Sequence, residues 1–160
     1  MINFDGVLSD ECESQILSVM TNKELHDAIG NAIIAAARMV REEAGPGLRE
    51  SYYETALTYE LVQAGHTVQR QCCFNVTYKG IDMNEHIVVD MLVDDLVIVE
   101  LKSLPYMDAR EYSQLITYLK LSGKKLGFLI NFGSASFAIG KFKESLPYYN
   151  AIYRVVNGLY

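Results

Sequence analysis

Residues 87–102 read IVVDMLVDDLVIVELK, and this stretch indicates the kind of fold to which the whole chain belongs. Its β-branched and aliphatic residues predict strands over residues 86–93 and 96–102, joined by a turn at Asp94 and Asp95. Both odd and even positions are apolar, which is typical of strands buried on both faces. Charges interrupt the run too often for a membrane span, which needs about 20 apolar residues. The stretch is therefore expected to form a hairpin at the centre of a sheet.

Three charged side chains interrupt the strands of this hairpin: Asp90, Glu100 and Lys102. Glu100 and Lys102 are two residues apart and so share one face of their strand. A two-residue turn would pair Asp90 with Val99 and point the two acids to opposite faces. A loop of three or five residues, or a bulge, pairs Asp90 with Glu100 instead. We predict this irregular turn, because charges kept among buried strands usually serve a function.

Two carboxylates beside a lysine are the groups that metal-assisted phosphodiester hydrolysis requires. Carboxylate oxygens bind hard cations such as Mg²⁺ or Mn²⁺, and the bound ion activates water and stabilises charge on the phosphate. The lysine can orient the water or neutralise the developing charge. In the alternative interpretation, Asp90 lies on a solvated face and Glu100 forms an ordinary ion pair with Lys102.

Helical and strand patterns on either side of the hairpin complete an α/β domain. Gly45-Pro46-Gly47 separates two helical patterns, and a capping box of Asp108 and Glu111 precedes a third helix that Gly123 closes. No linker divides the chain, so residues 1–160 are expected to form one domain with an N-terminal arm at 1–20. The other predicted elements, in the order ααβββαβ with one further strand, are helices 22–43 and 48–65, strands 67–78, 126–132 and 151–156, and a Gly-, Ser- and Ala-rich loop at 133–140.

Composition limits the class of protein. The chain has 160 residues, of which 50% are hydrophobic and 21% charged, enough for one compact core and unlike a disordered chain. Cys12, Cys72 and Cys73 lack the spacing of a zinc site and are expected to be reduced. The opening residues do not resemble a signal peptide, so we expect a cytoplasmic protein with no membrane association.

Charge is distributed unevenly along the chain. The net charge is −6, but the residues from Leu101 onward sum to +5 and the preceding hundred to −11. Binding of nucleic acid by overall charge is therefore excluded, and any contact with a polyanion must be local. The lysines of the basic part either face phosphates or are simply solvated. The candidates for substrate contact are Lys120, Lys124, Lys125, Lys141 and Lys143.

Four motifs together carry a resemblance to a known family. The segment GPGLRESYYETALTYEL holds Gly47, Glu50 and Tyr53 in GxxExxY spacing, and VVDMLVDDLVIVELKSL, SQLITYLKLSG and LGFLINFG follow in order. From about Glu24 to Phe132 the chain resembles the GxxExxY protein family of the PD-(D/E)XK nuclease superfamily. This resemblance implies a restriction-endonuclease-like fold, with a mixed central β-sheet flanked by helices, and a metal-dependent nuclease activity.

The resemblance also implies roles for individual residues. Asp90, Glu100 and Lys102 match the acid, acid and lysine of the superfamily, although Val89 stands where its motif has proline. The Leu101 carbonyl would be a further metal ligand. Two further sets complete the implied site: Gln114 and Tyr118 match the QxxxY helix of its RecB-like branch, and either Glu50 or Glu54 could approach the metal. We favour Glu54, because an acid in the first helical turn is already explained by the helix dipole.

The sequence thus predicts a metal-dependent nuclease that acts on DNA rather than RNA, with Mg²⁺ or Mn²⁺ as its cofactor. Two alternatives stay open. The chain could be a non-catalytic nucleic-acid-binding module on the same fold, or a dimerisation or assembly module, for which exposed apolar surface on the first helix would be the sign. No nucleotide-binding motif occurs. His26, His66 and His86 have no partner at ligand spacing and are assigned no role.

Overall fold

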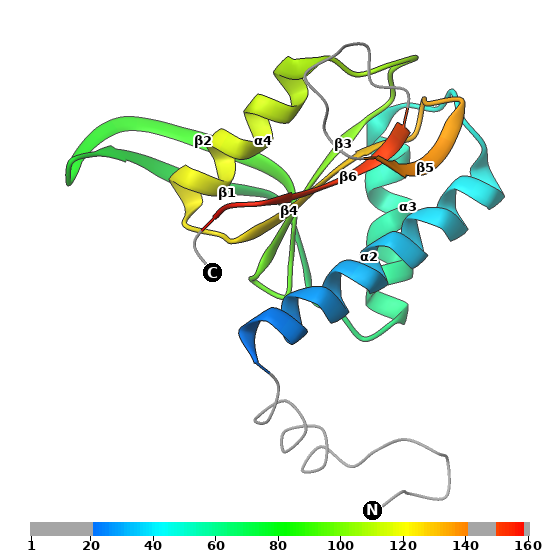
Figure 1. The fold of residues 1–160 in the computed structure, drawn as a ribbon, viewed down its shortest axis with the longest axis horizontal. Helices are drawn as coiled ribbons and strands as arrows, with labels where there is room; N and C mark the ends of the chain where they lie inside the picture. Colours follow the sequence, from blue (N-terminus) through cyan, green and yellow to red (C-terminus); the bar gives the residue numbers. More distant parts are fainter. Residues whose placement is uncertain (1–20, 141–149, 159–160) are drawn as a thin grey trace, which may run out of the picture.

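The protein has an α/β architecture in a computed structural model that describes residues 21–140 and 150–158 (Figure 1). The described strands form one sheet in the order β1-β2-β3-β4-β6-β5. The predicted arm at residues 1–20 and the lysines at 141 and 143 lie outside the described residues. The elements are α2 (Asn22–Ala44), α3 (Glu50–Gln63), β1 (Val68–Tyr78), β2 (Ile81–Val93), β3 (Val97–Lys102), α4 (Ala109–Ser122), β4 (Leu126–Asn131), β5 (Ser136–Gly140) and β6 (Asn150–Val156).

The sheet is mixed, as predicted. β1, β2 and β3 form an antiparallel meander, and β4 lies parallel to β3. Parallel neighbours require a crossover connection, which α4 provides. β6 is antiparallel to β4 and parallel to the edge strand β5. Every residue of β4 and all of β3 except Lys102 are buried, so these two strands are covered on both faces.

Helices cover the two faces of the sheet. α2 and α3 pack on one face, where Ile33 and Leu57 join Phe128 in the larger hydrophobic core. α4 covers the other face through Leu115 and Leu119 (Figure 1). α4 begins and ends where its caps predict: Asp108 and Glu111 form a capping box before it, and Gly123 ends it in a left-handed conformation with φ 71°.

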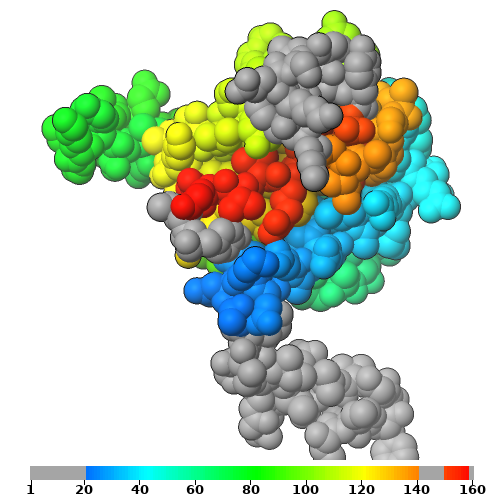
Figure 2. All heavy atoms as spheres, in the orientation of Figure 1, coloured from blue at the N-terminus to red at the C-terminus, as the bar shows by residue number. Residues whose placement is uncertain are grey.

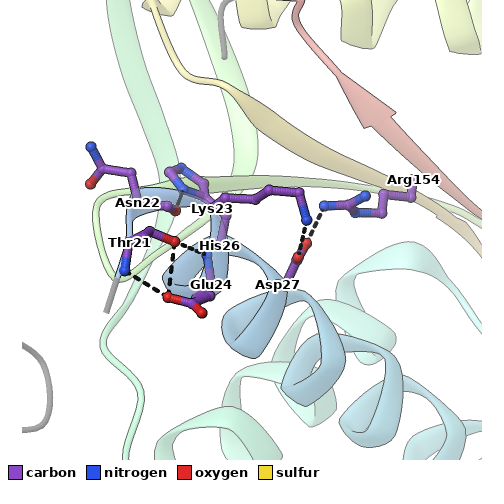
Figure 3. A network of polar contacts seen from close by, with 7 residues as sticks. All are labelled: Thr21, Asn22, Lys23, Glu24, His26, Asp27 and Arg154. Atoms are coloured by element: carbon purple, nitrogen blue, oxygen red, sulfur yellow. Dashed lines mark hydrogen bonds and ion pairs between the residues drawn. The ribbon is translucent and has the colours of Figure 1, made fainter. Parts of the chain in front are cut away.

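Polar contacts join the N-terminal part of α2 to strand β6. Thr21 and Glu24 form a capping box, and Asp27 accepts hydrogen bonds from Lys23 at 2.9 Å and from Arg154 of β6 at 2.5 Å. Figure 3 shows the Asp27 carboxylate between these two cations. The hydrogen bond from Lys23 holds the pKa of Asp27 below its usual value, with a smaller contribution from Arg154.

The turn between β2 and β3 is irregular, as predicted. Residues 94–96 form a three-residue loop, and Val93 pairs with Val97 and Met91 with Val99. Asp94 and Asp95 have φ values of 52° and 56°. The Asp94 carboxylate accepts hydrogen bonds from the Thr67 amide at 2.8 Å and from His66 at 2.6 Å, so contacts with the α3–β1 connection hold this loop. The register that places Asp90 opposite Glu100 is therefore confirmed.

The β1–β2 hairpin is longer than predicted. β2 begins at Ile81, directly after the Lys79-Gly80 turn, and not at residue 86. The missed part carries no alternating apolar pattern because both of its faces are exposed. It projects from the body of the protein as an arm (Figures 1 and 2). The prediction failed because backbone pairing with β1, rather than burial, keeps this part extended.

The predicted loop at 133–140 is wrong in part, since Ser136–Gly140 forms the edge strand β5. As the edge strand it has a neighbour on one side only, β6, and its residues are exposed or half-buried. A segment so rich in small residues has weak strand propensity. Its extended conformation comes from parallel pairing with β6. No local sequence pattern reveals that β6 lies beside this segment in the sheet.

The outer surface of α2 lacks the predicted sign of a dimerisation module. Among the large hydrophobic side chains of this helix, Met39 alone is strongly exposed, at 53%. The larger apolar residues Ile29, Ile33 and Val40 are buried in the core. No helix in the described part of the chain is long and apolar enough to cross a lipid bilayer.

Candidate functional site

The backbone ladder between β2 and β3 stops at Met91 and Val99, and side chains replace it beyond that point. The Asp90 amide donates to Oε1 of Glu100 at 3.2 Å, and the Leu101 amide donates to Oδ2 of Asp90 at 2.8 Å. Each carboxylate thus takes the place of a carbonyl on the opposite strand. The two strands separate here into a fork, and the two acids occupy it.

Burial and like charge make the fork a poor place for two anions. Glu100 is 3% exposed. Desolvation is the main cause that raises the pKa of Glu100 to about 8, and the neighbouring charge of Asp90 adds to it. Lys102 acts in the opposite direction, and Glu50 adds a further small increase. The fork therefore favours either a proton on Glu100 or a cation beside both acids.

Lys102 lies at the end of β3 on the same strand face as Glu100. Its side chain is half-buried, and no carboxylate of the described residues lies within ion-pair distance of it. The backbone on both sides is held: Phe132 donates to the Lys102 carbonyl at 2.8 Å, and Ser103 donates to Glu50 at 3.1 Å. The predicted alternative of a Glu100–Lys102 ion pair is thus not formed.

Helix α3 brings two further acids to the fork from one side of the sheet. Glu54 is 8% exposed and accepts from Arg70 at 2.6 Å and from the Gln71 side chain at 3.0 Å. Gln71 also reaches Asp90, with a long contact of 3.5 Å. Glu54 therefore approaches Asp90 through Gln71, whereas Glu50 is the α3 acid whose charge acts on Glu100.

The spacing of Gly47, Glu50 and Tyr53 produces a clamp on the end of β3. Gly47 has φ 97°, a backbone conformation that side chains disfavour. The buried Tyr53 hydroxyl donates to the Gly45 carbonyl at 2.8 Å and accepts from the Leu48 amide at 3.1 Å. The Leu48 carbonyl in turn accepts from the Ser103 hydroxyl at 2.6 Å. The motif therefore connects the α2–α3 turn to the residue that follows Lys102.

Removing the Tyr53 hydroxyl should destabilise the protein. Tyr53→Phe removes the hydrogen bonds to the half-buried Gly45 carbonyl and the Leu48 amide, and each lost hydrogen bond costs about 0.5–1.5 kcal/mol. Urea unfolding measures this loss. Tyr59→Phe is the control, because Tyr59 is 62% exposed. This substitution should change the free energy of unfolding by less than about 0.5 kcal/mol. Equal stability of Tyr53→Phe and the wild type would contradict the clamp.

With this geometry established, comparison with known proteins gives one match. The PD-(D/E)XK nuclease superfamily matches residues 27–142, which is most of the chain. The chain belongs to the PD-(D/E)XK nuclease superfamily. No curated protein and no solved structure gives a significant match. The order ααβββαβββ and the mixed sheet between helices are consistent with the restriction-endonuclease-like fold of this superfamily.

Nucleases of this superfamily typically use divalent metal ions, and the fork fits such an ion. Two carboxylates meet there, and burial together with the charge of Asp90 raises the pKa of Glu100. Within the described residues, no group of three or more His, Cys, Asp or Glu side chains is arranged to enclose a metal. Two carboxylates are enough for Mg²⁺, because this ion usually keeps several water molecules as its other ligands.

The QxxxY pair of this nuclease fold lies on α4, across the sheet from α3. The Gln114 side chain donates to the Tyr118 hydroxyl at 3.0 Å, so the two share one helix face as predicted. Tyr118 packs on the smaller hydrophobic core. Among the described residues, no hydrogen bond or ion pair joins Gln114 or Tyr118 to Asp90, Glu100 or Lys102.

Among the predicted substrate contacts, the described lysines Lys120, Lys124 and Lys125 do not lie around the fork. Lys124 and Lys125 precede β4, whose last residue, Asn131, lies beside Lys102. The lysines therefore lie at the opposite end of the parallel strands, roughly 15 Å away at 3.3 Å per residue. Lys120 is on the last turn of α4 at that same end. Lys124 also contacts Asp95, at 3.0 Å.

Sequence patterns missed the residues that support the Lys102 end of the site. The buried Asn131 side chain accepts from the Leu104 amide and donates to the Leu104 carbonyl, each at 2.9 Å. Gly133 lies so close to Leu104 that an added Cβ would be 2.5 Å from its carbonyl oxygen. A polar residue at the end of an otherwise apolar strand and the Gly two residues later were the available signals.

Proposed function

We propose that this chain is a metal-dependent nuclease that hydrolyses phosphodiester bonds, with DNA as the substrate rather than RNA. The observation that carries the proposal is the pair of carboxylates in the fork beside Lys102, which has no ion-pair partner among the described residues. The superfamily supports nuclease chemistry, and the clamp of Gly47, Glu50 and Tyr53 supports placement in the GxxExxY family. The preference for DNA rests on the family resemblance.

The residues of the fork divide the work of hydrolysis between them. Asp90 and Glu100 would hold the metal ion, and the Leu101 carbonyl and Glu54 would be its further ligands. A bound Mg²⁺ lowers the pKa of a water molecule and stabilises negative charge on the phosphate. Lys102 directs its ammonium group to the attacked phosphate, where negative charge develops in the transition state. The family resemblance assigns Gln114 and Tyr118 to the catalytic residues, and both lie on α4, on the other side of the sheet from α3.

A pocket in the β3–α4 connection, the segment that follows Lys102 in the chain, offers room for part of the substrate. It has a volume of about 410 Å³ and is lined by residues of the β3–α4 connection and the first turn of α4, including Tyr106 and Arg110. Tyr106 is 56% exposed, and an exposed tyrosine can stack on a base. The connection starts at Ser103, directly after Lys102, so this pocket belongs to the segment that leaves the fork.

Cleavage assays test the function directly. Purified protein is incubated with single-stranded, duplex and branched DNA and with RNA, each in magnesium, manganese or EDTA. We expect DNA cleavage with either metal, none in EDTA, and none by Asp90→Ala. Glu42→Gln, which changes an exposed acid on α2, should cleave normally. Binding of nucleic acid without cleavage in any metal would identify a non-catalytic module instead.

Metal binding should depend on both acids of the fork. Calorimetry should show Mn²⁺ or Mg²⁺ binding that Asp90→Ala and Glu100→Ala weaken markedly, since each removes a carboxylate ligand. Both variants should stay folded, because removing one of two facing carboxylates relieves repulsion in the metal-free protein. Unchanged binding in both variants would place the metal elsewhere.

Substrate binding should weaken steeply with salt if the basic residues meet phosphates. Each phosphate contact adds roughly 0.7–0.9 to the slope of log affinity against log salt concentration. Binding of DNA in EDTA is measured for the wild type and for the triple variant of Lys120, Lys124 and Lys125 to Ala. The triple variant should have a smaller slope than the wild type. Lys79→Ala, at the tip of the hairpin arm, should have the wild-type slope. Equal slopes would remove these lysines from the binding surface.

A further inference from the structure

Gln71 has a left-handed backbone conformation in the interior of a strand. Its φ is 50°, yet its neighbours Arg70 and Cys72 pair with Met91 and Val89 in continuous register. This register places Gln71 opposite Asp90. A residue other than glycine rarely adopts such a φ, and the strain persists only where surrounding structure imposes it.

The other strained positions have ordinary explanations. Among the described residues, the remaining non-glycine residues with positive φ are Lys79, Asn84, Asp94 and Asp95. Lys79, Asp94 and Asp95 lie in hairpin turns, and Asn84 lies where the β1–β2 register shifts. Turns and bulges need this backbone conformation. Gln71 alone among them lies where neither a turn nor a register shift requires it.

The side chain of Gln71 touches two of the carboxylates assigned to the metal. Its Nε2 donates to Oε2 of Glu54 at 3.0 Å and makes the long contact of 3.5 Å to Oδ1 of Asp90. These acids come from α3 and β2, which are separate elements. A carboxamide nitrogen carries two hydrogens, so one amide can serve one acceptor on each side. The second oxygen of each acid already has a partner, Arg70 for Glu54 and the Leu101 amide for Asp90.

We propose that Gln71 is a positioning residue that holds the Glu54 and Asp90 carboxylates in the orientation required for metal binding. The strained backbone of Gln71 directs its amide to these acids, and the amide lies between the two like charges. The inference deepens the proposed nuclease function and rests on it. Groups that orient metal ligands in this way typically change metal affinity about 10–100-fold when they are removed.

Two substitutions separate the amide from the backbone strain. Gln71→Met keeps the length of the side chain and the strained backbone but removes the donor. Gln71→Gly removes the donor and also relieves the strain, because glycine adopts positive φ freely. Lys79→Gly is the matched control, since Lys79 has φ 51° and lies in the turn at the tip of the hairpin arm.

Calorimetry with Mn²⁺ and thermal unfolding in EDTA are measured for all the variants, with Asp90→Ala alongside. We expect both Gln71 variants to bind Mn²⁺ about 10-fold or more weakly, and Lys79→Gly to bind as the wild type does. Both glycine variants should melt at a higher temperature than the wild type, and Gln71→Met should not.

The outcomes distinguish this inference from the proposed function. Wild-type Mn²⁺ affinity in Gln71→Met overturns the positioning role while the metal site stands. A lower melting temperature of Gln71→Gly, with Lys79→Gly stabilised, shows that the amide contacts serve stability and overturns the role of strain. If the wild type binds no Mn²⁺ and Asp90→Ala changes nothing, the metal site and this inference both fail.

Discussion

Lys102→Ala should cleave DNA about a hundredfold or more slowly than the wild type, the loss expected for one electrostatic group. Lys102 is half-buried beside Glu100 and has no ion-pair partner in the described residues, so its charge is available to the substrate. The clamp on Ser103 and the hydrogen bond from Phe132 hold its backbone in place. Negative charge on the phosphate grows only in the transition state, and the loss should therefore appear in the rate and hardly in binding.

Single-turnover kinetics measure the chemical step directly. Lys102→Ala should keep wild-type affinity for Mn²⁺ and DNA, and Lys102→Arg should restore little activity, since a planar guanidinium does not replace a compact ammonium beside a metal-bound water. Lys79→Ala, at the exposed tip of the hairpin arm, serves as the control. Cleavage by Lys102→Ala at the wild-type rate would make the lysine structural and remove the feature that separates this hairpin from any acidic metal site.

Glu100→Gln should stabilise the metal-free protein strongly at pH 8. The pKa of Glu100 is raised from 4.5 to about 8, so the folded state holds a proton that the unfolded chain has already lost between these two values. The free energy of unfolding of the wild type therefore falls as pH rises through this window. At about 1.4 kcal/mol per pKa unit, the total loss reaches up to about 5 kcal/mol. Glutamine avoids this loss because it never ionises, and its carbonyl can still accept from the Asp90 amide.

Urea unfolding in EDTA between pH 4.5 and pH 8.5 measures this dependence. The wild type should lose stability across the range, and Glu100→Gln should match it at the acidic end and exceed it at the alkaline end. Mg²⁺ should restore the wild type at pH 8 and have little effect on the variant, because the carboxylate must be ionised to bind metal. Glu42→Gln on the exposed side of α2 should follow the wild type throughout. Parallel curves for wild type and Glu100→Gln would show that Glu100 ionises normally.

The central strands, the helix ends and the register of the acids could all be predicted from local sequence. β3 and β4 are apolar at every position that the core requires, and capping residues mark the start and the end of α4. The argument that two charged side chains among buried strands must face each other predicted an irregular turn, a loop of three or five residues or a bulge, and the structure has the three-residue loop at 94–96. Such features depend on the spacing of residues that are near in sequence, which is why a single chain reveals them.

The hairpin arm and β5 could not be predicted, because their residues lack a buried face. Their strand conformation depends on backbone pairing with β1 and β6, and backbone groups are the same in every sequence. The choice between Glu50 and Glu54 was equally out of reach. One acts on Glu100 through its charge and the other on Asp90 through Gln71, a difference that helix spacing alone does not contain.

The sequence by itself determined the α/β class, the order of the central elements and the pairing of Asp90 with Glu100. Only the tertiary structure decided what that pair becomes. The separation of β2 and β3 turns the two carboxylates into substitutes for backbone carbonyls, and burial raises the pKa of Glu100. The left-handed Gln71 then joins Asp90 to an acid from α3. These features follow from contacts among segments distant along the chain and from the exclusion of water between packed layers, and neither is encoded in local periodicity.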